Sequence, residues 1–423
     1  MSPIALVLVT LIVAAVATVI ALNFVTGEKK IERVIEQHYG TEDPQFLRAM
    51  GALLGPALVA GNRVQTLENG DQIFPAMLKA IHGAQKTITF ETFIYWSGEI
   101  GASFADALSE RARAGVKVHV LLDWVGSAKM QDKYLDEMKA AGVKIEHYHP
   151  LRWYHLARMN NRTHRKLLVI DGKTGFTGGV GIAEQWTGHA QDDAHWRDLH
   201  YQVEGPVVAQ MQAAFMDNWM KTSGTVLHGI DYFPALEPVG EHFAQMFKSS
   251  SNEGSESMRL MYLLSINAAE HSLRIANAYF VPDDLTVKAL IDARERGVKV
   301  QILVPGPDID TELVRRASRA RWGKLLEAGV EISEYQPTML HVKLMIVDEL
   351  WVSVGSTNFD NRSFRLNDEA NLNVYDREFA QQQTAIFKRD LAQAKPFDFA
   401  TWQKRPWSEK LLEHSAALFR SQL

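Results

Sequence analysis

The chain contains no cysteine among its 423 residues. This absence excludes a disulfide framework, a thiol nucleophile and a cysteine-ligated zinc site. An excess of positive charge is also absent, because 45 Lys and Arg stand against 50 Asp and Glu, for a formal net charge of -5. The whole molecule therefore has no general attraction for nucleic acid or acidic lipid, and any such attraction has to be local.

Charged residues are missing from the first 27 residues as well. An apolar stretch of about 20 residues can span a bilayer, and a cleaved signal peptide would have a basic start and a shorter apolar run. We therefore predict a single-pass transmembrane anchor over 1–27, followed by a juxtamembrane segment over 28–59. Basic residues follow the apolar run and none precedes it, so the positive-inside rule places the body on the cytoplasmic side. These basic residues are Lys29, Lys30 and Arg33.

The remainder of the chain reads as a duplication. Stretches 86–96, 109–122 and 139–150 are matched in the same order by 271–281, 291–304 and 326–337. The match of 109–122 with 291–304 joins the end of a helical pattern, a glycine and a strand pattern. Strands that alternate with helical stretches indicate repeated α/β units around a mixed sheet. We expect two similar halves, over 60–247 and 258–423, joined by the Ser-rich connection 248–257.

A short motif occurs once in each half. "THRKLLVIDG" (163–172) and "HVKLMIVDEL" (341–350) both place a lysine two residues after a histidine, then four apolar residues and an aspartate. Residues i and i+2 of a strand point to the same face, so each histidine projects beside its lysine. The apolar runs suit strands that are buried on both faces. If the halves pack about a pseudo-twofold axis, the two units converge on one site.

This convergence predicts phosphate chemistry. Lys166 and Lys343 would form a cradle for an anionic phosphate, while His164 and His341 would supply a nucleophile and an acid. Unperturbed imidazoles have a pKa of about 6.5, which suits both roles. A metal site would need three or four converging ligands, and two neighbouring ammonium groups would repel the ion. We expect no metal and no cofactor.

Four more residues fit the same site. Ser356 and Asn358, in "GSTN", are candidates for hydrogen bonds to phosphate oxygens. The first half has "GGVG" at this place, so Gly181 stands where the second half has Asn358. Asp198 in "WRDLH" and Glu369 in "NDEANL" are candidates to hold the outer nitrogen of each histidine, which would fix its tautomer and stabilise the imidazolium.

The repeated pattern H-x-K-x4-D followed by G-[GS]-x-N resembles the phospholipase D superfamily, and residues from about 60 to 423 resemble its bacterial cardiolipin synthase branch. Supporting stretches are "ENGDQIFPAMLKAI", "NRTHRKLLVIDGKTGFTGG", "WRDLH" and "ANAYFVPD". The resemblance implies an α/β fold, a duplicated α-β-α sandwich whose halves share one active site. It also implies phosphatidyl transfer through a phosphohistidine, without metal, to a lipid alcohol such as phosphatidylglycerol.

The resemblance also assigns roles within the catalytic set. His164 would be the nucleophile, His341 the acid and base, and Asp171 and Asp348 mainly structural. Lys166, Lys343 and Asn358 would bind phosphate, whereas Gly181 departs from the asparagine usual in the first motif. The catalytic set comprises His164, Lys166, Asp171, His341, Lys343 and Asp348.

The expected partners are phospholipid substrates and the bacterial inner membrane, with no nucleic acid, and the sequence leaves the oligomeric state open. Stretches 149–165 and 402–412 mix Trp with Lys and Arg, which favours a lipid headgroup interface, above all for the first; an ordinary surface loop is the alternative. Rival functions are hydrolysis with water as acceptor, and a nuclease or other phosphodiesterase on the same fold. A nuclease should carry a broad basic surface. A catalytically inactive lipid-binding protein is disfavoured because both motifs are intact.

Overall fold

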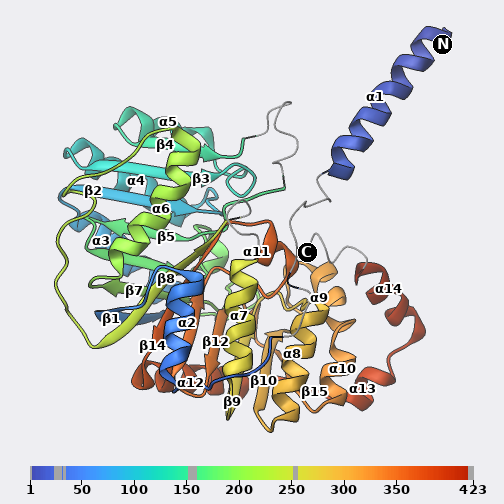
Figure 1. The fold of residues 1–423 in the computed structure, drawn as a ribbon. Helices are drawn as coiled ribbons and strands as arrows, with labels where there is room; N and C mark the ends of the chain where they lie inside the picture. The colour runs from blue at the N-terminus through green and yellow to red at the C-terminus, as the bar shows by residue number, and fades with distance from the viewer. Residues whose placement is uncertain (1, 23–30, 32–34, 151–159, 251–255, 418–423) are drawn as a thin grey trace.

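The computed structural model describes residues 2–22, 31, 35–150, 160–250 and 256–417 (Figure 1). Two helices come first, α1 (Pro3–Leu22) and α2 (Pro44–Leu54). The first half then contains β1 (Val59–Glu68), α3 (Asn69–Gly83), β2 (Thr87–Thr92), α4 (Glu99–Arg113), β3 (Lys117–Asp123), α5 (Asp132–Ala140), β4 (Lys144–Tyr148), β5 (Leu167–Ile170), β6 (Thr174–Gly178), the 3-10 helix η2 (Glu184–Trp186), β7 (Leu199–Glu204) and α6 (Val208–Ser223).

The second half repeats this order of elements. It contains β8 (His242–Ser249), α7 (Ser257–Ala268), β9 (Ser272–Asn277), α8 (Asp284–Glu295), β10 (Lys299–Pro305), α9 (Glu312–Arg319), α10 (Trp322–Glu327), β11 (Glu331–Tyr335), β12 (Lys343–Val347), β13 (Trp351–Gly355), α11 (Asn361–Arg365), β14 (Glu369–Tyr375) and α12 (Arg377–Leu391). Strand β15 (Ala394–Phe397) and helices α13 (Phe399–Gln403) and α14 (Trp407–Ala417) follow.

The strands form one 15-stranded sheet in the order β15-β11-β10-β9-β12-β13-β14-β8-β1-β7-β6-β5-β2-β3-β4. The order is symmetric about the antiparallel pair β8–β1, apart from the extra edge strand β15. In each half three strands run parallel, and the strand carrying the motif is antiparallel to the first of them. The start of each motif strand therefore lies at the edge of the sheet where the parallel strands end.

Helices cover both faces of the sheet. In the first half, α3 and α4 share a core with Leu168 and Ile170, whereas Leu167 and Val169 face a second core that contains residues of both α6 and α12. The apolar run of β5 is thus buried on both faces, as its composition predicts. The run of β12 divides in the same way between α7 and α8 on one face and the shared core on the other.

The boundary between the halves differs from the expected one. The sequence analysis placed residues up to 247 in the first half and the connection at 248–257. Strand β8 instead pairs with β14 from Phe243 to Ser249, and it occupies in the second half the place of β1 in the first. The first strand of the second half therefore begins at His242. Strand membership depends on this long-range pairing, to which local composition gives no clue.

The N-terminal helix α1 stands apart from the body (Figure 1) and exposes apolar side chains such as Ile4, Leu6 and Leu11. Within the described residues, no helix meets the combined length and apolarity required to cross a bilayer. The predicted transmembrane anchor over 1–27 stays a prediction. Ile31 is the first described residue after α1, and it contacts the body: its backbone N–H donates to Glu256 at 2.7 Å and its carbonyl accepts from Arg259 at 3.1 Å.

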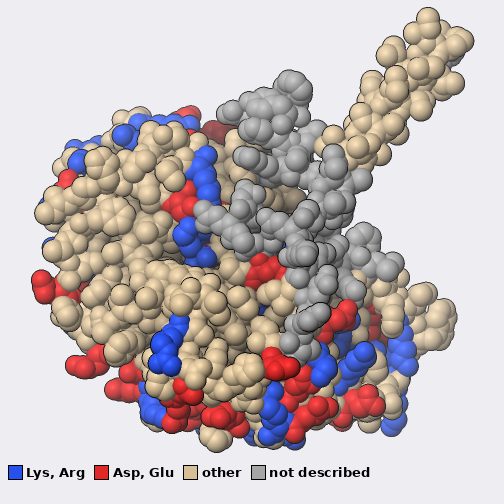
Figure 2. All heavy atoms as spheres, in the orientation of Figure 1, with Lys and Arg blue, Asp and Glu red and all other residues tan. Residues whose placement is uncertain are grey.

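The sequence analysis predicted that residues 149–165 face lipid headgroups. This prediction is wrong for Arg165, and residues 151–159 of the stretch lie outside the described residues. Arg165 is fully buried and its guanidinium binds Asp217 at 3.1 Å. In the second stretch Arg405 is buried against Glu413, while Trp407 is 78% exposed. On the face shown in Figure 2, Lys and Arg are mixed with Asp and Glu along the body, without a separate basic side.

Candidate active site

The two motifs meet at one cavity. His164 and Lys166 lie just before β5, and His341 lies just before Lys343, the first residue of β12. Each motif is held by the other half, because the His164 N–H donates to the Asp368 carbonyl and the His341 N–H to the Arg197 carbonyl, both at 2.8 Å. The cavity has a volume of about 130 Å³ and is lined by Phe93, Ile94, His164, Lys166, Gly181, Trp186, Trp196, Tyr279, Asp310 and His341.

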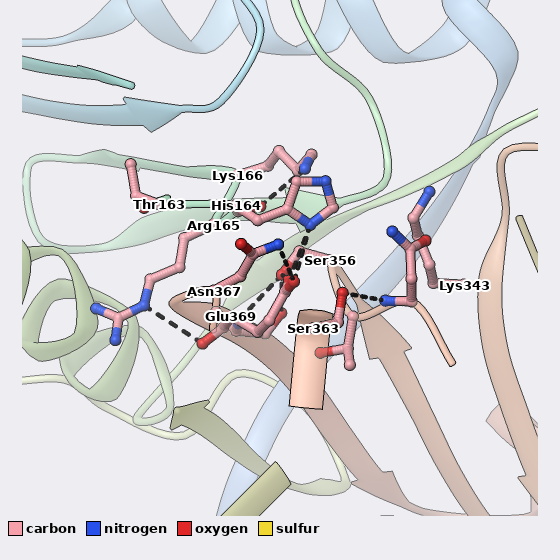
Figure 3. A network of polar contacts seen from close by, with 12 residues as sticks. Thr163, His164, Arg165, Lys166, Lys343, Ser356, Ser363, Asn367 and Glu369 are labelled. Atoms are coloured by element: carbon pink, nitrogen blue, oxygen red, sulfur yellow. Dashed lines mark hydrogen bonds and ion pairs between the residues drawn. The ribbon is translucent and has the colours of Figure 1, made fainter. Parts of the chain in front are cut away.

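Each histidine is paired with a carboxylate of the opposite half. His164 Nδ1 lies 3.0 Å from both oxygens of Glu369, as Figure 3 shows, and His341 Nδ1 lies 2.7 Å from Asp198 Oδ2. A carboxylate accepts, so Nδ1 carries the proton in both rings. Nε2 is then the reactive nitrogen of each imidazole. The sequence analysis selected these four residues but left their pairing open. In the structure, each histidine pairs with the carboxylate from the other half.

The two carboxylates are supported differently. The Ser356 hydroxyl donates to Glu369 Oε2 at 2.6 Å, whereas Asp198 Oδ2 accepts from the Trp186 indole N–H at 3.0 Å. The hydroxyl of Ser356 therefore supports the carboxylate behind His164, and its binding to phosphate stays a prediction. Gly179 corresponds to Ser356 in the first half, and a Cβ there would lie 2.1 Å from Asp198 Oδ1. Glycine at 179 leaves room for this carboxylate.

Burial controls the charges of the histidines. It lowers the pKa of His164 to about 4, against the opposing effect of Glu369, and the pKa of His341 to about 3, where Lys343 lowers it further. Burial raises the pKa values of Asp198 and Glu369, but their histidines, the neighbouring lysines and further hydrogen bonds together outweigh it, and both pKa values lie below the usual range. Each dyad therefore consists of a neutral imidazole and an ionised carboxylate near neutral pH.

The lysines are buried beside the histidines. Lys166 Nζ donates to the His164 carbonyl at 2.8 Å, and Lys343 Nζ donates to the His341 carbonyl at 2.6 Å. Burial lowers the pKa of Lys166 to about 7 and that of Lys343 to about 8, against the effects of Glu369 and Asp198. An anion bound between them would favour their charged forms.

The motif aspartates lie at the far ends of their strands, away from the cavity. Asp171 accepts the backbone N–H groups of Gln85, Lys86 and Thr87 at 2.7–3.2 Å. Asp348 accepts those of Glu270, His271 and Ser272 at 2.8–2.9 Å. Both aspartates have positive φ, 54° and 50°, in the turn to the next strand. The structure therefore separates them from the histidines and lysines.

The two halves line the cavity unequally. Asn358, at the corresponding place of the second half, is buried, and its Oδ1 has no hydrogen-bond partner among the described residues. Gly181 lines the cavity at the equivalent place, and a Cβ there would lie 2.8 Å from Ile94 Cβ and 3.2 Å from Trp186 Cζ3. The space that an asparagine would occupy in the first half is thus taken by Ile94 and Trp186.

Six cavity residues were not selected from the sequence. Ile94 and Tyr279 occupy equivalent places in the matched stretches 86–96 and 271–281, which is a signal that could have found them. Trp196 lies two residues before Asp198 and its ring lies 5.5 Å from that of His341. Phe93 lies in the same matched stretch as Ile94, but its counterpart Ala278 does not line the cavity. Trp186 and Asp310 have no comparable signal, since only folding brings η2 and the β10–α9 loop to the site.

Comparison with known proteins agrees with this geometry. The family model described as "Cardiolipin synthase, PLD-like domain" matches residues 77–219 and 262–391, one segment in each half. The chain belongs to this cardiolipin synthase family. The mixed α/β fold with a duplicated phospholipase D-like domain is therefore confirmed.

Relatives within the cardiolipin synthase family cover most of the chain. A "Cardiolipin synthase" of Geobacillus sp. (strain WCH70) is 34% identical over 403 residues, which are 94% of this chain and 80% of that protein. "Cardiolipin synthase 2" of Bacillus anthracis is 32% identical over 401 residues, 94% of this chain and 77% of that protein. The crystal structure of phosphatidylserine synthase from Haemophilus influenzae Rd KW20 shares the fold, with a TM-score of 0.70, 14% identity and coverage of 90% and 100% of the two chains.

Proposed function

We propose that this protein is a phosphatidyltransferase of the cardiolipin synthase type. It would transfer a phosphatidyl group from a donor phospholipid to the alcohol of an acceptor lipid such as phosphatidylglycerol, in keeping with the names of its relatives. The observation that carries the proposal is the pair of crossed dyads, His164–Glu369 and His341–Asp198, at one cavity. Neither half of the chain contains a complete dyad.

The first step forms a covalent intermediate. His164 Nε2 attacks the phosphorus of the donor, so that a P–N bond forms and the P–O bond to the headgroup alcohol breaks. His341 donates a proton to the departing oxygen, and Glu369 stabilises the imidazolium that develops on His164. Lys166 and Lys343 balance the charge of the phosphate, with Asn358 as a further ligand.

Protonation of His341 depends on the substrate. Burial and Lys343 favour the neutral ring, whereas a negatively charged phosphodiester at the cavity favours the charged one. His164 needs no proton for its attack, and Glu369 already holds its Nδ1–H. The two rings can therefore differ in protonation when the substrate binds.

The second step reverses the chemistry with a new alcohol. His341 removes the proton of the acceptor hydroxyl, whose oxygen attacks the phosphorus and displaces His164 Nε2. Two in-line displacements retain the configuration at phosphorus. With water as acceptor the same residues would give hydrolysis, so the identity of the product separates the two activities.

We also propose that α1 holds the enzyme at the bacterial inner membrane with the body on the cytoplasmic side. Its uncharged composition and its exposed apolar side chains support this placement, as do the basic residues Lys29, Lys30 and Arg33 that follow. The substrates would be reached from the lipid surface itself.

A trapping experiment tests the covalent mechanism and the two roles. The protein is mixed with a labelled phosphodiester that has a good leaving group, quenched, and digested to find the labelled peptide. His164→Ala should give no label, whereas His341→Ala should still be labelled at His164, because such a leaving group needs no proton. Loss of general acid–base help slows turnover roughly 10²–10⁴-fold, so both variants should appear inactive at steady state.

The outcomes are distinct. Label on the peptide of His341 alone would reverse the roles, and no acid-labile, base-stable label on either peptide would contradict the covalent mechanism. Phosphatidic acid as the main product of the wild-type enzyme, in place of a diphosphatidyl lipid, would contradict transfer as the principal activity.

A further inference from the structure

Tyr279 and Asp310 line the catalytic cavity although neither belongs to a catalytic motif. Tyr279 follows β9, and Asp310 lies in the loop between β10 and α9. The Tyr279 hydroxyl donates to Asp310 Oδ2 at 2.6 Å. Burial and Asp310 both raise the pKa of Tyr279, so the phenol keeps its proton for this contact. The pair thus presents an oriented carboxylate at the cavity.

This pair lies on the side of His341. Lys343 pairs with Asn277 in the β9–β12 ladder, and the Ala278 N–H continues the ladder by donating to the Val342 carbonyl at 3.0 Å. Tyr279 is therefore level with His341. Asp310 also contributes to raising the pKa of Lys343, which places its charge within electrostatic reach of that ammonium.

The first half has no equivalent of this pair. Ile94 stands at the place of Tyr279, since the bridges Tyr95–Ile182 and Phe280–Phe359 correspond in the two halves. The cavity wall beside Ile94 is completed by Gly181 and Trp186 and is apolar. The fold by itself does not require a polar pair at this place.

A carboxylate here is unsuited to the phosphate, which it would repel, and the lysines already provide for that group. It is suited to a neutral or cationic group that donates hydrogen bonds. In the proposed mechanism His341 protonates the leaving oxygen, which belongs to the headgroup alcohol of the donor lipid. The remainder of that headgroup then lies beside Tyr279 and Asp310.

We propose that Asp310, oriented by Tyr279, binds the headgroup of the donor lipid and selects an alcohol that carries a further hydroxyl group, as glycerol does. The carboxylate accepts a hydrogen bond from that hydroxyl while the neighbouring oxygen leaves phosphorus. This inference rests on the proposed function and adds a residue that discriminates between donors at the same site. Asp310 is a specificity-determining residue, and the bonds broken and formed are those of the transfer itself.

A competition assay tests the selection. Equimolar phosphatidylglycerol and phosphatidylmethanol, each labelled in its headgroup, are presented in the same detergent micelles, and released glycerol and methanol are counted. Their ratio reports relative kcat/KM for the two donors. Removal of a hydrogen bond to a charged group should lower the ratio about tenfold in Asp310→Ala. Tyr279→Phe, which keeps the carboxylate but loses its support, should lower it less.

Asp308→Ala is the matched control, because Asp308 is an exposed aspartate of the same loop that does not line the cavity. Its ratio should equal that of the wild type. An unchanged ratio in Asp310→Ala, with both rates falling together, would overturn the selection and leave Asp310 an electrostatic support of Lys343. A wild-type enzyme that releases neither headgroup would instead overturn the proposed function, and this subsite with it.

Discussion

Two histidine–carboxylate pairs and two lysines are buried together at the active site, and each pair shares one proton. The Nδ1–H of each imidazole points to a carboxylate from the other half, and Lys166 and Lys343 lie beside them. Burial disfavours every charge in this group, so each ammonium and carboxylate depends on the others for its ionisation. The two ammonium groups and the two carboxylates cancel, so a bound phosphate adds one negative charge, which favours a proton on His341.

The lysines predict a particular pH dependence. Their pKa values are lowered to about 7 for Lys166 and about 8 for Lys343, so the charged forms are present below these values and are lost as the pH rises through them. We expect kcat/KM for a soluble short-chain phosphodiester to fall as the pH rises above about 7–8. The measurement is a pH profile from 5 to about 10, in steps of roughly half a unit.

The kcat profile supplies an internal control. It reports the enzyme with substrate bound, in which the phosphate stabilises both ammonium groups. Its alkaline decline should therefore lie at higher pH than that of kcat/KM. A kcat/KM that stays constant to pH 9 would show that the lysines remain charged in the free enzyme, against the effect of burial.

At the scale of single elements, each motif strand is fastened at both ends. The end at the cavity is bound across the halves by the N–H groups of His164 and His341. The other end is closed by Asp171 or Asp348, each of which accepts three consecutive backbone N–H groups. The spacing from histidine to aspartate in each motif therefore corresponds to one strand, which has the active site at one end and the hydrogen-bonded aspartate at the other.

We therefore expect Asp171→Ala to lower stability without removing activity from the folded fraction. An unsatisfied donor typically costs about 1–3 kcal/mol, and the partial exposure of these N–H groups to water keeps the loss within that range. Thermal unfolding and the specific activity of the soluble protein are the measurements. Asp171→Asn is the matched control, since asparagine keeps one acceptor oxygen and tolerates the positive φ of 54°.

The result of Asp171→Ala also separates two readings of the motif. A lower melting temperature with activity retained would support the anchor. Normal stability with activity abolished would place the carboxylate in the chemistry, despite its distance from the cavity.

At the scale of the whole molecule, the body and the N-terminal helix are separate parts. Among the described residues, Ile31 contacts the body through Glu256 and Arg259, and α1 projects from the body (Figure 1). Deletion of residues 1–27 should therefore leave a folded enzyme that acts on lipid in detergent and that is less associated with membranes. Circular dichroism, a detergent assay and membrane fractionation measure the three effects.

A deletion of residues 1–36 is the informative comparison, because it also removes Ile31 and Ile35, which pack against the core of the second half. It should lower stability further than the shorter deletion. Loss of all detergent-phase activity in the protein lacking 1–27, with its fold retained, would contradict a purely attaching role for the helix.

Much of the fold and of the site was predictable from the sequence, for local reasons. The repeated H-x-K-x4-D spacing, the strands buried on both faces and the order of matched stretches depend on residues close in the chain, whose side-chain directions follow from strand geometry. Asp198 and Glu369 were found in the same way, as carboxylates at similar places in the two halves. The motif also indicated the family, which the comparisons confirm.

The tertiary structure alone decided what depends on contacts between distant residues. In the folded protein each carboxylate binds the histidine of the other half, and the Ser356 hydroxyl donates to Glu369. At Gly181, which corresponds to Asn358, Ile94 and Trp186 occupy the space that a side chain would need. The tertiary structure also buried Arg165 and brought Tyr279 and Asp310 to His341. Sequence periodicity specifies the face on which a side chain lies, whereas its partner is set by how two halves pack, and that packing is encoded only in the whole chain.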